Sequence, residues 1–218
     1  MPYTPFMPEF DDLPQTLPVF PLADAVVMPG TELPLNIYEQ RYLKMVADAM
    51  GSNRMFGMVQ PDPTREEEPA AIFRTGCSGR ITRYHETADG RIELVLTGLC
   101  RFNIREELAG TSGYRVVDPD WEPYRTDYKL LRSNDFQHRD RLIQLLDSFF
   151  IATRMETDWK KLLTIPADRL VNTLTTVLPL DSMEKQALLE AITPQDRIDT
   201  LITALEIECH EAHSVPQH

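Results

Sequence analysis

The chain has 218 residues, of which 42% are hydrophobic and 26% are charged, and its formal net charge is −12 at pH 7. This composition is typical of a folded domain with a packed core, and it argues against a fibrous or wholly disordered chain. Nucleic-acid binding depends on Lys and Arg, so an acidic chain without a Lys/Arg cluster is not expected to bind nucleic acid.

The first half of the chain, residues 13–125, is expected to form a β-rich subdomain. It follows a loose, acidic, proline-broken arm over residues 1–12, which lacks the features of a signal peptide. Prolines inside the apolar stretches favour edge strands or strand ends. The expected strands cover residues 17–22, 33–38, 55–60, 81–84, 92–96, 99–104 and 114–117. Residues 61–69 read as a polar loop.

Two turns punctuate these strands. Met28-Pro29-Gly30 separates the first two strands, and Ala88-Asp89-Gly90 joins the two arms of a hairpin. Asp-Gly is the preferred pair for the positive φ angles that a tight hairpin demands, so we expect a tight turn at Asp89-Gly90.

One helix, residues 39–50, interrupts the β-rich half. Its apolar stripe at helical spacing is Leu43, Val46, Ala47 and Met50, which we expect to face the core, with Gly51 as the cap. The outward face then contains Arg41, Lys44, Met45 and Asp48.

The second half, residues 126–212, is expected to form a helical bundle, followed by a frayed tail at 213–218. Three apolar stripes mark its helices: Leu142, Leu145, Leu146, Phe149 and Phe150; Leu170, Val171, Leu174, Val177 and Leu178; Ile198, Leu201, Ile202 and Leu205. Asp181 with Glu184 predicts a capping box, and Thr193-Pro194 predicts another helix start. Strands followed by helices, without alternation, indicate an α+β chain.

Few residues suggest chemistry. The chain contains neither GxxxxGK[ST] nor GxGxxG, so ATP hydrolysis is not expected. Gly76-Cys77-Ser78-Gly79 only superficially resembles a nucleophile loop, because His85 lies eight residues further along one extended strand. The densest group of potential metal ligands, residues 208–213, is terminal and lacks a remote partner. The three cysteines form no CxxC and favour a reducing compartment. We expect no catalytic residues, metal or cofactor, no membrane association, and a cytoplasmic location.

Several separated motifs nevertheless resemble the N-terminal substrate-recognition domain of Lon protease. They are Leu17-Pro-Val-Phe-Pro-Leu22, Met28-Pro29-Gly30, Leu33-Pro-Leu35, Tyr38-Glu-Gln-Arg-Tyr42, Gly76-Cys-Ser-Gly-Arg-Ile81 and Val95-Leu-Thr-Gly-Leu-Cys-Arg-Phe102, in which Gly98 and Arg101 occupy the marked positions. The resemblance extends through Leu178-Pro-Leu180 to about Glu208. It implies a PUA-like β-rich subdomain followed by a helical bundle, and a role in recognising polypeptides. The ATPase and Ser-Lys protease modules of Lon are not expected in this sequence.

The favoured hypothesis is therefore a non-catalytic module that binds unfolded or apolar polypeptide segments or a protein partner. Its candidate contacts are Arg41, Lys44, Met45 and Asp48 on the helix and Met28 and Pro29 as an exposed lip. Under the alternative interpretation, Met45 is an isolated surface residue, and Met28 and Pro29 only close a turn against the core. A small hydrolase or ligand-binding enzyme on the same fold is the second hypothesis, and RNA binding, opposed by the net charge, is the third.

Overall fold

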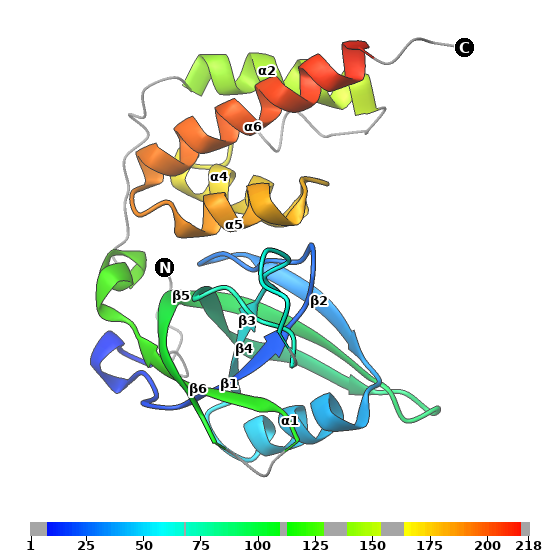
Figure 1. The fold of residues 1–218 in the computed structure, drawn as a ribbon, viewed down its shortest axis with the longest axis vertical. Helices are drawn as coiled ribbons and strands as arrows, with labels where there is room; N and C mark the ends of the chain where they lie inside the picture. Colours follow the sequence, from blue (N-terminus) through cyan, green and yellow to red (C-terminus); the bar gives the residue numbers. More distant parts are fainter. Residues whose placement is uncertain (1–7, 68, 110–112, 129–138, 154–163, 215–218) are drawn as a thin grey trace. The chain divides into compact units, whose positions relative to one another are not determined.

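The structure is a computed structural model that describes residues 8–67, 69–109, 113–128, 139–153 and 164–214 (Figure 1). The chain is divided into two compact units, Met1–Leu130 and Leu131–His218. The first contains η1 (Phe10–Asp12), β1 (Leu17–Pro21), β2 (Glu32–Ile37), α1 (Gln40–Met50), β3 (Met55–Val59), β4 (Thr75–Glu86), β5 (Ile92–Leu108), β6 (Arg115–Asp120) and η2 (Glu122–Tyr128). The second contains α2 (Arg139–Thr153), α4 (Ala167–Val177), α5 (Ser182–Glu190) and α6 (Pro194–Ser214). The fold is thus mixed α+β, as predicted.

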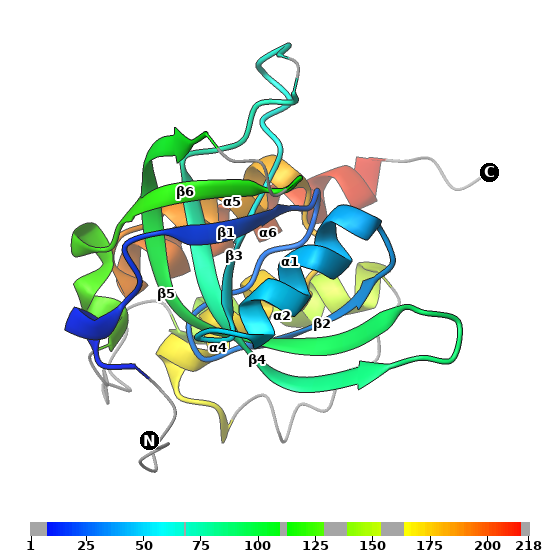
Figure 2. The ribbon, with the colours of Figure 1, turned by 90° about the horizontal axis from the view of Figure 1, so that it is seen from below.

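The strands of the first unit form one six-stranded sheet in the order β2-β5-β4-β3-β1-β6, and a further pairing between β5 and β6 closes it on itself. β5 makes this closure possible because it is long. It pairs with β4 along most of its length, while its other edge pairs first with β2 and then with β6. The hairpin that joins β4 to β5 projects from the sheet, and α1 packs beside β1 and β3 (Figure 2). The PUA-like classification stays a prediction.

The turn Met28-Pro29-Gly30 packs into the sheet and does not form an exposed lip. Met28 is fully buried, its carbonyl accepts a hydrogen bond from the Thr31 amide at 3.0 Å, and Gly30 has a φ of 78°. Proline followed by a glycine with positive φ is the sequence that a type II turn requires. The turn then binds Gly98: the Gly30 amide donates to the Gly98 carbonyl, and the Gly98 amide donates to the Thr31 carbonyl.

Only glycine fits at position 98, because the Met28 backbone leaves no room for a side chain there. A Cβ there would overlap the carbonyl oxygen of Met28 and lie 2.8 Å from its carbonyl carbon. Two segments of the sequence pattern, the Met28 turn and the glycine of β5, are therefore in direct contact. Both the Met28 turn and Gly98 therefore have a structural role, which is to hold the turn against β5.

Arg101, the other marked residue of β5, is also structural. Its side chain is 1% exposed, and it forms an ion pair with the 7% exposed carboxylate of Asp127 in η2. The guanidinium donates to Asp127 from Nε at 3.0 Å and from Nη2 at 2.8 Å, and the Arg101 amide donates at 3.0 Å. The guanidinium also lies 4.4 Å from the ring centroid of Tyr124. Arg101 thereby fastens η2 to β5.

Three local predictions need correction. The buried face of α1 consists of Tyr42, Met45, Val46 and Ala49, one residue out of phase with the predicted stripe. Burial of Tyr42, whose ring packs on Phe20 at 4.4 Å between centroids, rotates the helix and takes Met45 into the core. In the hairpin only Gly90 has a positive φ, of 82°, because the loop from Thr87 to Arg91 is longer than a two-residue turn.

At the N-terminus, residues 10–12 of the expected loose arm form the 3-10 helix η1. Phe10 packs edge-on against Tyr128 at 5.6 Å between ring centroids. Aromatic packing of this kind fixes a segment that its proline content and acidity suggested would be loose.

The described helices of the second unit share one apolar core. Its buried residues are Leu142, Leu146, Phe149, Phe150, Leu170, Val171, Leu174, Leu178, Leu180, Leu188, Ile198, Leu201, Ile202 and Leu205. They include most of the predicted stripes, whereas Val177 is 59% exposed. The capping box of Asp181 and Glu184 is confirmed. None of the helices in the described ranges is long and apolar enough to cross a bilayer.

Candidate polypeptide-binding groove

The binding residues predicted on α1 do not form an apolar surface. Arg41, Lys44 and Asp48 are exposed, but Met45 is completely buried. Lys44 donates to Asp48 at 2.6 Å, and the hydroxyl of Tyr114 donates to the same carboxylate at 2.7 Å. The hydrogen bonds from Lys44 and then from Tyr114 lower the pKa of Asp48. With Met28 buried as well and Pro29 half-buried, a contact role for Met28 or Met45 is wrong, and one for the remaining residues stays a prediction.

The candidate nucleophiles lie inside the sheet. Cys77 and Ser78 are buried, and the Ser78 hydroxyl donates to the Cys100 carbonyl at 2.8 Å. His85 is exposed near the far end of the same strand, β4, so it does not reach them. Burial also raises the pKa of the Cys100 thiol, which keeps that sulfur protonated and a poor nucleophile. This part of the chain therefore lacks the contact between nucleophile and base that hydrolysis needs.

The histidines and carboxylates at the end of α6 form no recognisable ligand set. Among the described residues, no group of three His, Cys, Asp or Glu side chains is placed to hold a metal ion. The side chains beyond His210, including His213, lie outside what the structure describes.

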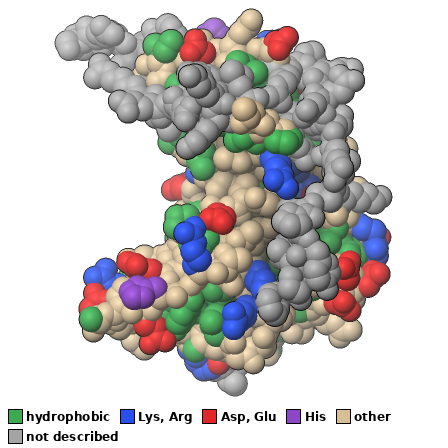
Figure 3. Space-filling view, turned by 180° about the vertical axis from the view of Figure 1, so that it is seen from behind, with side chains coloured by type: hydrophobic (Ala, Val, Ile, Leu, Met, Phe, Trp, Pro, Cys, Tyr) green, Lys and Arg blue, Asp and Glu red, His purple; other side chains and the backbone are tan. Residues whose placement is uncertain are grey.

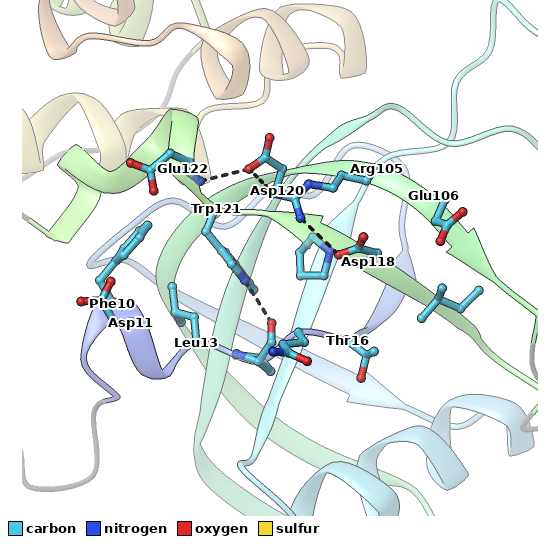
Figure 4. A pocket seen from close by; sticks show the side chains of 14 residues that line it. Phe10, Asp11, Leu13, Thr16, Arg105, Glu106, Asp118, Asp120, Trp121 and Glu122 are labelled. Carbon is cyan, nitrogen blue, oxygen red and sulfur yellow. Dashed lines mark hydrogen bonds and ion pairs between the residues drawn. The ribbon is translucent and has the colours of Figure 1, made fainter.

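A groove of about 520 Å³ opens on the first unit between the segment that precedes β1 and the paired strands β5 and β6 (Figure 4). We call it the Trp121 groove. It is lined by Phe10, Asp11, Leu13, Pro14, Gln15, Thr16, Arg105, Glu106, Leu108, Asp118, Pro119, Asp120, Trp121 and Glu122. Six of these side chains are apolar, so the groove offers both apolar and charged surface.

The groove opens because the ladder between β1 and β6 is short. Pairing runs from Val19 opposite Arg115 only as far as Leu17 opposite Val117. Beyond that point Pro119 has no N–H with which to continue the ladder. The chain before β1 separates from β6, and the gap between them becomes the groove.

Two features fix the walls of the groove. The indole Nε1 of Trp121, the residue between β6 and η2, donates to the Pro14 carbonyl at 3.0 Å and so ties the end of β6 to the segment before β1 (Figure 4). A register shift between Ile104 and Glu106 makes Arg105 the extra residue of a β-bulge. Bulges re-aim side chains, and here the Arg105 guanidinium lies 3.0 Å from Asp120 and 3.8 Å from Asp118.

A second, smaller groove of about 450 Å³ lies over β2, β5 and β4, around Asn36, Tyr84 and Val95. Its charged neighbours include both signs, and Arg83 pairs with Glu32 at 2.7 Å. In the view of Figure 3, acidic and basic side chains are likewise interspersed on the described surface, with apolar side chains between them.

These features can be compared with known proteins. Residues 16–206 match the family model of the ATP-dependent protease La (LON) substrate-binding domain. The chain belongs to this family. The Lon protease of Elusimicrobium minutum is 27% identical over 212 residues, which cover 92% of this chain and 25% of that protein. Lon protease 2 of Myxococcus xanthus is 33% identical over 98 residues, or 44% of this chain and 12% of the relative. The chain thus spans about a quarter or less of these curated relatives.

Solved Lon N-terminal domains share the fold. The domain from Xanthomonas campestris superposes with a TM-score of 0.60 at 24% identity, over 86% of this chain and 97% of the other. The domain from the Mycobacterium avium complex gives 0.61 at 17% identity, over 88% and 98%. The Lon motifs in the sequence therefore indicated the correct family and fold.

The same motifs did not indicate the groove of this Lon substrate-binding domain. Trp121, Leu13 and Pro14 stand outside them, and Arg105 reaches its position through a bulge that residue spacing does not reveal. The only signal in the sequence was a pair of prolines, Pro14 and Pro119, close to the ends of expected strands.

Proposed function

We propose that this Lon substrate-binding domain is a non-catalytic module that binds polypeptides, and that the Trp121 groove holds an extended segment of the bound chain. The observation that carries the proposal is an open groove with six apolar side chains on a unit of the substrate-binding family. Apolar side chains of an unfolded segment would displace water from the partly exposed Trp121, Leu108 and Pro14, which is the main source of affinity in such contacts.

The geometry favours an extended chain over a compact ligand. The groove runs beside β6 where its ladder with β1 has ended, so a bound segment would lie alongside strands and not in a closed cavity. The hydrogen bond from Trp121 to Pro14 and the bulge at Arg105 hold both walls before binding. A preformed site loses less conformational entropy on binding.

The hydrolase alternative receives no support from its candidate residues. Cys77 and Ser78 are buried, and His85 is distant along β4. Binding without cleavage is the simpler account of this unit.

The proposal is tested by filling the groove. Gln15 is exposed on its wall, so Gln15→Trp adds bulk without removing an internal contact. Gln40→Trp, at the exposed start of α1, makes the same substitution away from the groove. Binding of a fluorescein-labelled, uncharged Gly/Ser/Asn peptide with spaced Phe and Leu residues is measured by fluorescence anisotropy. We expect Gln15→Trp to weaken binding by about tenfold, the loss of one buried apolar contact, and Gln40→Trp to bind like the wild type.

Equal affinities of wild type and Gln15→Trp would show that the peptide binds elsewhere. No binding by the wild-type chain, to this peptide or to a charged one of the same design, would refute the proposed function itself.

A further inference from the structure

The Trp121 groove has an unbalanced charge. Five of its lining residues are acidic: Asp11, Glu106, Asp118, Asp120 and Glu122. Arg105 pairs with two of them, and Arg125, just outside the groove, pairs with Asp11 at 3.2 Å and Glu122 at 3.0 Å. Five carboxylates therefore face two guanidinium groups, which leaves three negative charges in excess around an apolar floor.

We infer that the Trp121 groove selects polypeptide segments in which lysine or arginine stands next to an apolar residue. This inference rests on the proposed function and adds the class of segment that is bound. An acidic segment would bring further carboxylates to a rim that is already negative, and a purely apolar one would leave the excess charge uncompensated.

Specific contacts are available for both parts of such a segment. Glu106 is exposed and takes part in no ion pair among the described residues, so it is free to accept a cation. Asp11 is 83% exposed and can exchange its long contact to Arg125 for a ligand cation. The half-buried ring of Trp121 offers apolar surface and an aromatic face to an alkyl stem and its charged head. Side chains with an apolar stem and a cationic end are those of lysine and arginine.

The test compares three labelled peptides that differ only in charge. The uncharged Phe/Leu peptide is made again with spaced Lys residues, and again with Glu at the same positions. Anisotropy titrations are run on the full chain at low salt and at about 0.5 M salt, where exposed charges are screened. We expect the Lys peptide to bind about tenfold more tightly than the uncharged one at low salt, the Glu peptide to bind most weakly, and the differences to shrink at high salt.

Two double variants decide where the preference arises. Asp11→Asn with Glu106→Gln removes two carboxylates of the groove, whereas Glu66→Gln with Glu67→Gln removes two charges from an exposed loop and alters the net charge equally. The groove variant is expected to lose most of the preference for Lys, and the loop variant to keep it.

The outcomes separate the inference from the function on which it rests. Equal binding of all three peptides would overturn the cationic preference and leave polypeptide binding standing. Loss of the preference in the loop variant but not in the groove variant would overturn its assignment to this groove. If none of the peptides binds, the proposed function fails together with the inference.

Discussion

The buried ion pair between Arg101 and Asp127 provides the sharpest test of how the sequence motif acts. Arg101→Met keeps most of the side-chain volume but removes two hydrogen bonds, of 3.0 and 2.8 Å, from a carboxylate that is only 7% exposed. Asp127 would then be a buried charge that retains the hydrogen bond from the Arg101 amide.

Breaking a buried pair from one side costs about 3–5 kcal/mol of folding free energy, because the remaining charge is desolvated without compensation. The contact of the guanidinium with Tyr124 is lost as well. The double change Arg101→Met with Asp127→Leu removes both charges and should cost less, about 1–3 kcal/mol, mainly for the backbone amide left without an acceptor. We therefore expect a strongly favourable coupling energy between Arg101 and Asp127 in a double-mutant cycle.

The assay is urea unfolding followed by tryptophan emission. In a Trp159→Phe background, Trp121 is the sole tryptophan and reports on the first unit. Arg83→Met is the matched control, because Arg83 pairs with Glu32 at 2.7 Å but both side chains are exposed, by 69% and 58%. That exposed pair should contribute less than about 1 kcal/mol. If Arg101→Met and Arg83→Met lower the free energy of unfolding equally, or the double variant is less stable than Arg101→Met alone, the explanation given for Arg101 is refuted.

Three further predictions follow from packing, charge and burial. In urea unfolding, Gly98→Ala should lower the free energy of unfolding by about 3 kcal/mol or prevent folding, since the new Cβ would overlap the Met28 backbone. Gly51→Ala, whose Cβ would have its nearest neighbour at 3.5 Å, should stay within about 1 kcal/mol of wild type. Similar stabilities of the two variants would contradict the close approach of Gly98 to Met28. In ¹³C-detected NMR titration, the carboxyl of Asp48 should titrate below its ordinary pKa, and Lys44→Met should raise that pKa. Because the folded pKa of Asp48 is lowered, the stability that this carboxylate contributes is complete above the unfolded pKa and is lost as pH falls through the folded pKa. An unchanged pKa of Asp48 in the variant would rule out the Lys44 contact as the cause. A thiol reagent should modify Cys209 first and the two buried cysteines only in denaturant, and rapid reaction of more than one thiol in the native protein would disprove their burial.

Local patterns in the sequence were enough to predict most of the helices and strands and to identify the family. The spacing of Ile198, Leu201, Ile202 and Leu205 indicated a buried helix face because helical periodicity is a property of neighbouring residues. The capping box at Asp181 is also local, and it appears in the structure as expected. The motif around Gly98 indicated a fold without revealing what the glycine does.

Errors arose where a position depends on residues far away in the chain. Met45 satisfied the pattern of an outward residue, but the ring of Tyr42 packs on Phe20 and turns Met45 into the core. Val177 satisfied the pattern of a core residue and is exposed, because the partner helices do not cover it. Helical spacing gives the period of a stripe, whereas its phase is set by the surface against which it packs.

The sequence by itself determined that this chain is an acidic α+β protein of the Lon substrate-binding family, because composition, periodicity and ordered motifs are all read along the chain. Only the tertiary structure decided where a polypeptide could bind. The Trp121 groove exists because β5 pairs with β6, a bulge re-aims Arg105, and Trp121 reaches Pro14, which is 107 residues away in sequence. Pairings between such distant segments depend on closure of the whole sheet, and no local pattern contains that information.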